Sequence, residues 1–198
     1  MAEQQPMGTG RLEAFSDGVI AIIITIMVLE LKVPLHADAA TLLAQWPVFL
    51  SYALSYLVVA IYWVNHHRLF HIVPRVNSAV LWSNNFLLFC MSLIPFATAY
   101  MGENQFKPFP TAVYAALLLA CSVAFLILRE VVSRELRELG RFDLLRTQAR
   151  RKNFISIGLY ALSVPAAYLH PAITMVLAFA VAGLYFLPEA FMDDPEPR

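Results

Sequence analysis

Six long apolar segments run through almost the whole chain and leave little sequence between them. They lie near residues 10–33, 47–70, 77–101, 109–132, 153–169 and 171–191. A helix needs about 17–25 predominantly apolar residues to cross a bilayer, and the segments have about that length. Hydrophobic residues make up 60% of the chain, whereas soluble domains are about 45–50% apolar. The sequence therefore predicts an all-α membrane protein with six transmembrane helices, of which Pro95 and Pro165 are expected to kink the third and fifth.

The basic residues are distributed unevenly between the two sides of this bundle. All Lys and Arg residues except Lys32 and Lys107 fall at the N-terminus, in the second-to-third or fourth-to-fifth connection, or in the C-terminal tail. Cytoplasmic loops carry the excess of Lys and Arg in most membrane proteins. We therefore expect a multi-pass protein of the cytoplasmic membrane with both termini in the cytoplasm. Residues 34–45 then form an external loop.

The parts outside the six segments are short. Residues 1–9 form a polar leader, and residues 192–198 form a C-terminal tail. Residues 129–152 are basic, and we expect a cytoplasmic helical extension there that breaks near Gly140. This basic segment could bind anionic lipid headgroups, but an orientation signal and a solvated helix face explain it better. The sequence thus predicts one transmembrane domain, residues 10–191.

The first segment has an uncharged stretch that is too short for a helix surrounded by lipid. Only Gly18 to Leu29 is free of charge, between Asp17 and Glu30. This stretch rises about 18 Å as a helix, against a bilayer core of about 30 Å. A carboxylate inside hydrocarbon costs from about 2.5 kcal/mol upward, and burial among helices or beside water removes most of this cost. We therefore expect the first helix at the centre of an assembly, with Asp17 bound to another helix or subunit.

One narrow stripe along this first helix is apolar apart from a single hydroxyl. At 100° per residue, four positions fall within about 60° of one another. They are Gly18, Ile22, Thr25 and Leu29. Ser16 and Asp17 point away from this stripe. The helix therefore has an almost uncharged face and a separate polar cluster near its start.

The start of the first segment resembles a known family motif. The pattern Arg-x-x-x-Phe-Ser-Asp-(Gly/Ala) opens the first helix of the transmembrane protein 175 family of potassium channels. This chain reproduces it with Arg11, Phe15, Ser16, Asp17 and Gly18. WVNHHRLF, residues 63–70, is also similar to the end of that family's second helix. The resemblance covers essentially the whole chain and implies a potassium-preferring cation channel, with the first helices of a homotetramer lining a central pore.

The resemblance also implies roles for individual side chains. Ile22 would form a hydrophobic gate with Leu29 as a further ring, and Thr25 would contribute to selectivity. The five motif residues would anchor the pore helix. His66, His67 and Trp82 are further candidates for the network around this anchor. Other polar residues of the second and third segments could belong to it, namely Trp63, Asn65, Asn84 and Asn85.

The mechanism that the resemblance implies is a ring of Ile22 side chains that closes the path by excluding water. The sequence contains no Thr-Val-Gly-Tyr-Gly filter loop. One feature fits this pore less well, because continuing the stripe places Arg11 and Lys32 near its two mouths. Tilt or splaying of the helices would be needed to move these cations away from the path.

Three other functions remain open at this point. A secondary transporter usually has unwound helices and an internal repeat, and the sequence shows no duplicated pattern. A proton-permeable leak pathway would use the same pore. A membrane metalloenzyme would need metal ligands, and His67 and His71 are i,i+4 neighbours as such ligands can be. Hydrogen bonds from the histidines to groups such as Ser16 or Asp17 explain them better than a metal site does. We therefore expect no enzyme activity, no cofactor and no nucleic-acid partner, with potassium ions and membrane lipid as partners.

Overall fold

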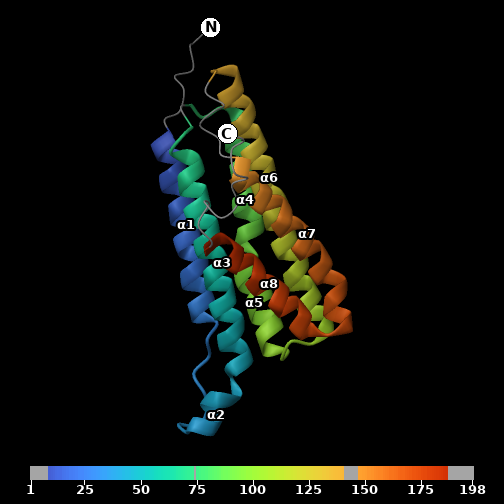
Figure 1. The fold of residues 1–198 in the computed structure, drawn as a ribbon. Helices are drawn as coiled ribbons and strands as arrows, with labels where there is room; N and C mark the ends of the chain where they lie inside the picture. The colour runs from blue at the N-terminus through green and yellow to red at the C-terminus, as the bar shows by residue number, and fades with distance from the viewer. Residues whose placement is uncertain (1–8, 74, 141–146, 187–198) are drawn as a thin grey trace.

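The computed structural model describes residues 9–73, 75–140 and 147–186, which form helices joined by short connections (Figure 1). The helices are α1 Thr9–Leu29, α2 Ala39–Ala44, α3 Trp46–Phe70, α4 Ser78–Ser92, α5 Ile94–Glu103, α6 Pro108–Glu138, α7 Thr147–Leu169 and α8 Pro171–Phe186. Four rods are long and apolar enough to cross a membrane, namely α1, α3, α6 and the pair α4 and α5 taken together. The helical architecture predicted from the sequence is therefore confirmed for the described residues.

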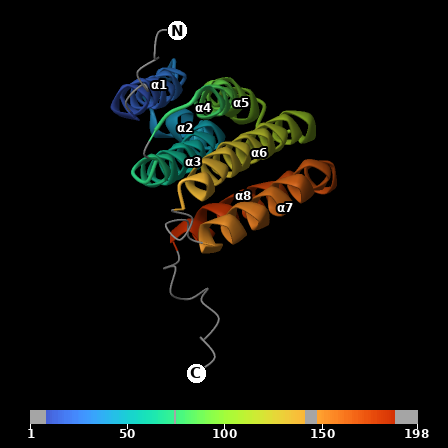
Figure 2. The ribbon, with the colours of Figure 1, turned by 90° about the horizontal axis from the view of Figure 1, so that it is seen from above.

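The helices are stacked in layers (Figure 2). At one edge α1 packs on α3, α4 and α5, while α6 packs on α4 and α5 from the other side. The opposite edge consists of α7 and α8, which pack on α6 and on each other. Fully buried apolar side chains such as Leu54, Met91 and Leu118 fill the space between the layers. As an edge helix, α1 turns one face to the bundle and leaves the other uncovered.

Local sequence signals explain where several helices begin. Proline occupies the first turn of α3, α5 and α6, where its missing N–H costs nothing because the first amides of a helix have no partner within it. The side chain of Asn77 accepts a hydrogen bond from the Val80 amide at the start of α4, at 2.9 Å. Such a cap supplies a partner that the first turn lacks.

Two local features differ from the sequence-based expectation. The connection over residues 34–45 contains the short helix α2, because the Asp38 side chain accepts a hydrogen bond from the Thr41 amide at 2.7 Å and caps a helical turn. The third segment is divided at Leu93 into α4 and α5. Pro95 lacks the N–H that would continue the ladder to the carbonyl of Met91, so the kink expected at this proline is a break. The helix α7 continues through Pro165.

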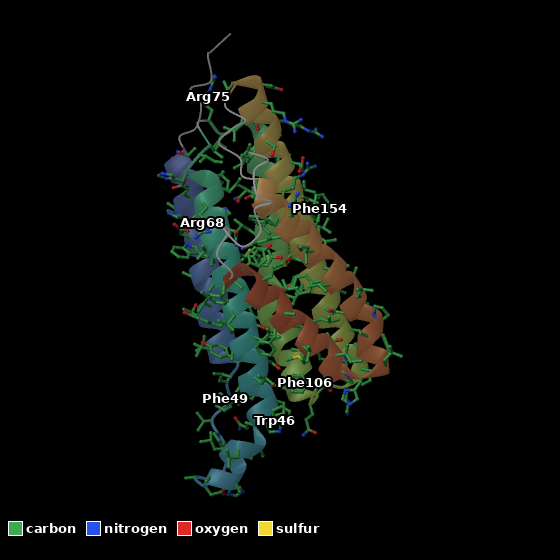
Figure 3. The ribbon with its side chains drawn as sticks, in the orientation of Figure 1. Trp46, Phe49, Arg68, Arg75, Phe106 and Phe154 are labelled. Carbon is green, nitrogen blue, oxygen red and sulfur yellow. The ribbon has the colours of Figure 1, made fainter. Side chains whose placement is uncertain are left out.

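The two ends of the bundle differ in charge. Arg68 and Arg75 lie at the end where α1 begins and α6 finishes, and Trp46 and Phe106 lie at the opposite end (Figures 1 and 3). Lys32 follows the last turn of α1 at this second end. The uneven distribution of basic residues along the sequence therefore becomes a basic end and a less basic end in space.

Candidate functional site in the first helix and its anchor

One face of α1 is buried against the bundle. Its buried residues recur every three or four positions, which places them on one side of the helix. They are Leu12, Ser16, Ile20, Ile23 and Met27. Burying each large aliphatic side chain contributes about 1.5–3 kcal/mol in water, less where lipid is the alternative. Ser16 is the exception in this apolar row, and its hydroxyl makes the polar contacts described next.

The buried polar contacts of Ser16 join three helices. The Asn84 side chain of α4 donates a hydrogen bond from Nδ2 to Ser16 Oγ at 3.0 Å, and its Oδ1 lies 2.7 Å from Nε2 of His66 in α3. Because Oδ1 can only accept, His66 is the donor in this pair. Ser16 Oγ in turn donates to the Leu12 carbonyl at 2.8 Å. Since all three side chains are buried, this chain of hydrogen bonds holds α1 to α3 and α4 at one register.

Asp17 uses a separate partner on the same neighbouring helix. Trp63 Nε1 of α3 donates a hydrogen bond to Asp17 Oδ1 at 2.9 Å. The Trp63 ring stacks on His67, with centroids 5.9 Å apart and an interplanar angle of 20°, and His71 continues the row with its ring centroid 6.4 Å from that of His67. The carboxylate expected to need a donor on another helix or subunit thus has one on another helix.

The opposite face of α1 carries the stripe singled out in the sequence. Ile22 is 58% exposed and Leu29 is 78% exposed. A Cβ added at Gly18 would meet no atom within 4 Å. Thr25 is exposed too, and its hydroxyl donates to the Ile22 carbonyl at 2.8 Å. Because that bond uses the hydroxyl hydrogen, the lone pairs of Thr25 Oγ1 remain available to a cation.

The remaining candidates lie around this helix in different ways. Arg11 and Phe15 are exposed on α1. Trp82 is 72% exposed on α4, and within the described part of the chain no hydrogen bond joins it to Ser16 or Asp17. Of the polar residues that the resemblance suggested, Trp63 and Asn84 make the direct contacts. The sequence signal for Trp63 and Asn84 is that each is a side chain able to form hydrogen bonds within an apolar segment.

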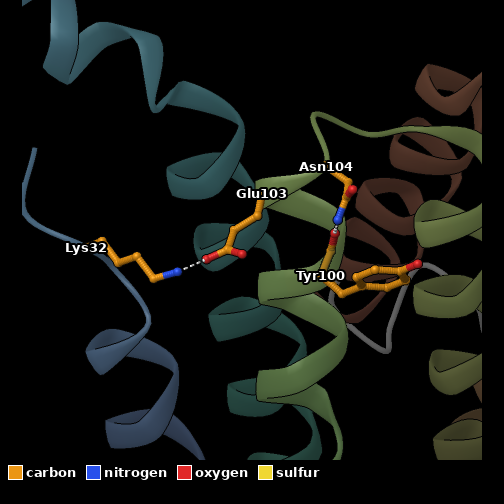
Figure 4. Close-up of polar contacts among 4 residues, drawn as sticks. All are labelled: Lys32, Tyr100, Glu103 and Asn104. Carbon is orange, nitrogen blue, oxygen red and sulfur yellow. Dashed lines mark hydrogen bonds and ion pairs between the residues drawn. The ribbon is translucent and has the colours of Figure 1, made fainter.

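An ion pair joins the residues that follow α1 to the end of α5. Lys32 Nζ lies 2.5 Å from Glu103 Oε1 at the end of α5 (Figure 4). This hydrogen bond raises the pKa of Lys32 above its usual value, so the pair is lost only as pH rises through that raised pKa, well above neutrality. Figure 4 also shows the end of α5, where Asn104 Nδ2 donates to the Tyr100 carbonyl at 2.8 Å. Lys32, which the sequence placed near one mouth of the expected pore, is therefore directed toward α5 and paired there with a carboxylate.

The histidines do not form a metal site in the described residues. No group of three or more His, Cys, Asp and Glu side chains in this part of the chain could hold a metal ion. His66 is directed to Asn84 and His67 to the Trp63 ring. Their contacts are those expected of residues that support α1.

Comparison with known proteins gives consistent relatives. Residues 11–95 match a family described as "Endosomal/lysosomal potassium channel TMEM175". A Chryseobacterium protein (strain P1-3) named as a potassium channel is 43% identical over 183 residues, which cover 92% of this chain and 95% of that protein. A human protein named "Endosomal/lysosomal proton channel TMEM175" is 31% identical over 134 residues, which cover 62% of this chain and 26% of the human protein.

The fold has a relative among solved structures as well. The crystal structure of a lysosomal potassium-selective channel TMEM175 homologue from Chamaesiphon minutus superposes with a TM-score of 0.79 at 31% identity. The superposition covers 89% of this chain and 95% of that chain. The similarity therefore extends beyond the first helix and its motif.

Proposed function

Because the chain belongs to the TMEM175 family and is a multi-pass membrane protein, we propose that it is a potassium-preferring cation channel. Its relatives are named as ion channels, a function without catalysis, in agreement with the expectation that the chain is not an enzyme. In this proposal six spans form the protomer, with α7 and α8 as the fifth and sixth. Four protomers surround a pore in the cytoplasmic membrane, and both termini lie in the cytoplasm.

One observation carries the proposal, the contrast between the two faces of α1. One face is packed and held by the contacts of Ser16 and Asp17, while the other exposes Ile22, Thr25 and Leu29. An edge helix fixed on one side is suited to line a path that only several copies can enclose. The short uncharged stretch supports the same arrangement, because water and sister copies tolerate the flanking Asp17 and Glu30 better than acyl chains do.

The proposed gate is a hydrophobic constriction. Four Ile22 side chains around an axis would form a narrow apolar ring, and Leu29 would form a second one nearer the outer end. Such a ring closes by losing its water, and a small shift of the helices rewets it. Preference for K⁺ over Na⁺ would follow from the larger dehydration cost of Na⁺ at the ring, helped by the oxygen lone pairs of Thr25.

The motif residues would set the position of this gate. The hydrogen bonds of Ser16 and Asp17 connect α1 to α3 and α4 directly before Gly18, and Ile22 follows about one turn after Gly18. A change in these bonds would therefore move Ile22 relative to its counterparts. Arg11, Phe15 and Gly18, which lie on exposed parts of α1, would act in the contacts between copies.

A proton-permeable pathway is a second candidate, because the human relative is named a proton channel. Water that enters an open constriction also carries protons. The two candidates differ in the ion that collapses a membrane potential. The test is therefore a flux assay on purified protein in liposomes with K⁺, Na⁺ and H⁺ gradients imposed separately, together with a mass measurement of the detergent-solubilised oligomer. Flux that follows only the H⁺ gradient, or a monomeric mass, would contradict the potassium channel.

The gate has its own test in Ile22→Asn. A polar ring is harder to dewet, so we expect a higher basal K⁺ flux, about tenfold for a barrier lowered by about 1.4 kcal/mol. Ile155→Asn is the matched control, because Ile155 is also exposed but lies on α7 at the far edge of the protomer. Equal flux in the two variants, each with wild-type mass, would rule out Ile22 as the constriction.

A further inference from the structure

A cavity of about 290 Å³ lies beside α3, and none of its lining residues belongs to α1. The α3 wall consists of residues that share one side of that helix by their three- and four-residue spacing. They are Leu57, Ala60, Ile61, Val64, Asn65 and Arg68. The facing wall is formed by Lys152 of α7 and by Tyr185 and Phe186 of α8. The cavity therefore lies between three helices on a part of the protein that the proposed pore does not use.

The α3 wall changes from apolar to cationic toward the basic end of the bundle. Leu57 and Ile61 line the part farther from this end, Asn65 follows along the helix, and Arg68 lies in the last turn of α3. From Leu57 to Arg68 the helix rises about 16 Å. A phospholipid has its groups in the same order, with acyl chains first, then the ester carbonyls and then the phosphate.

Two cationic side chains line the polar part of the cavity, Arg68 and Lys152. The Lys152 ammonium lies 5.9 Å from the centre of the Tyr185 ring, and the Tyr185 hydroxyl lies 3.5 Å from Ser156 Oγ. A guanidinium recognises phosphate through paired N–H groups, and an ammonium does so as a point charge. A zwitterionic headgroup would bring its own ammonium toward these two cations. The lining therefore favours a ligand with a net negative headgroup.

We propose that this cavity binds one anionic phospholipid. The phosphate lies between Arg68 and Lys152, and an acyl chain follows the apolar surface of Ile61 and Leu57 into the membrane. The site holds lipid from the leaflet at the basic end of the bundle. It requires only that the protein spans a membrane, and it stands whether or not the protein conducts potassium.

The headgroup contact is tested by native mass spectrometry of the full-length protein in detergent, titrated with phosphatidylglycerol or phosphatidylcholine. We expect one phosphatidylglycerol per protomer to survive desolvation and phosphatidylcholine to bind more weakly. Arg68→Gln should weaken phosphatidylglycerol binding about fivefold, as loss of one basic residue near a membrane surface does. Arg75→Gln is the matched control, because Arg75 is exposed at the same end but does not line the cavity.

A second pair of variants separates insertion into the cavity from attraction to a basic surface. Ala60→Trp fills the cavity without changing its charge and should abolish binding, as should the smaller change Val64→Phe in case the tryptophan variant does not fold. Ala53→Trp, at an exposed position of α3 outside the cavity, should bind as the wild type does. Unchanged binding in both cavity variants would overturn the proposal.

Two other occupants are outcomes of the same experiment. If inorganic phosphate displaces the lipid, the site recognises a simple anion, and the lipid assignment is wrong. Residues 187–198 contain four carboxylates and follow α8 directly. If phosphatidylglycerol binds only when residues 187–198 are removed, the chain's own tail competes for Arg68 and Lys152. The proposal for the full-length protein then fails.

Discussion

Asn84 has a role that no other side chain at that position could take without loss. Its amide nitrogen donates to Ser16 and its oxygen accepts from His66, so it uses both functions of the group between two buried partners. A carboxylate could not donate to Ser16, and an aliphatic side chain would leave both partners without their bond to this position. The position of α1 therefore depends on one asparagine in α4.

Asn84→Ala should lower the stability of the protein by about 2–3 kcal/mol, because a buried polar group left without a partner costs about 1–3 kcal/mol. Thermal unfolding in detergent measures the change. Asn104→Ala is the matched control, since Asn104 donates to its own helix at the half-buried end of α5 and should cost about 1 kcal/mol or less. Equal melting shifts in the two variants would contradict the anchoring role of Asn84.

Thr25 offers the second prediction at this scale. Thr25→Val keeps the shape of the side chain and removes the oxygen, so we expect a lower K⁺/Na⁺ permeability ratio from bi-ionic reversal potentials. Thr25→Ser retains the hydroxyl and should stay close to the wild type. A ratio that is the same in all three proteins would remove Thr25 from the selectivity step.

The helices themselves could largely be predicted from the sequence, whereas their partners could not. Apolar length and proline positions located the long helices, because burial in a membrane demands long apolar helices. The helix α2 escaped prediction, since it depends on a single cap at Asp38. The pairing of Lys32 with Glu103 escaped for a different reason, because two residues in separate segments meet only after the bundle has packed. Trp82 was expected near the anchor, but its direction on α4 depends on helix rotation.

The connection between α1 and α5 gives a prediction for these elements. Glu103→Gln would leave Lys32 as an uncompensated cation near the outer end of the proposed pore. We expect a lower K⁺ conductance at low salt and no difference at about 1 M, where the screening length falls to about 3 Å. The effect on stability should be small, as for other exposed ion pairs.

The double variant Lys32→Gln with Glu103→Gln provides the control for this experiment, because it removes both charges. Its single-channel conductance at low salt should return to the wild-type value. A conductance that is reduced equally in the single and double variants would show that the glutamate acts by another route than neutralising Lys32.

At the scale of the whole molecule, the chain leaves one face of α1 uncovered. The stripe from Gly18 to Leu29 is exposed, whereas Ile20, Ile23 and Met27 on the opposite face of α1 are buried. The sequence predicted this stripe, since helical spacing alone defines it. The sequence could not show which helices cover the opposite face of α1, because that depends on how the helices are arranged in layers.

Gly18→Leu tests whether copies meet along this stripe. The added side chain has space within the protomer, so we expect an unchanged helical content but a smaller oligomer or a blocked K⁺ flux. Light scattering and the liposome assay measure the two effects. Gly158→Leu, at an equally open exposed position on α7, should alter neither. Wild-type mass and flux in Gly18→Leu would place Gly18 away from the contacts between copies.

The break at Leu93 has a mechanical consequence. The third segment makes polar contacts at both ends of α1. Asn84, before the break, bonds to Ser16, and Glu103, after the break, pairs with Lys32 just beyond the last turn of α1. If α5 rotates about Leu93 while α4 stays in place, it moves the C-terminal end of α1 and leaves the N-terminal end fixed. The angle between α4 and α5 would then be the coordinate along which the bore of the assembly widens or narrows.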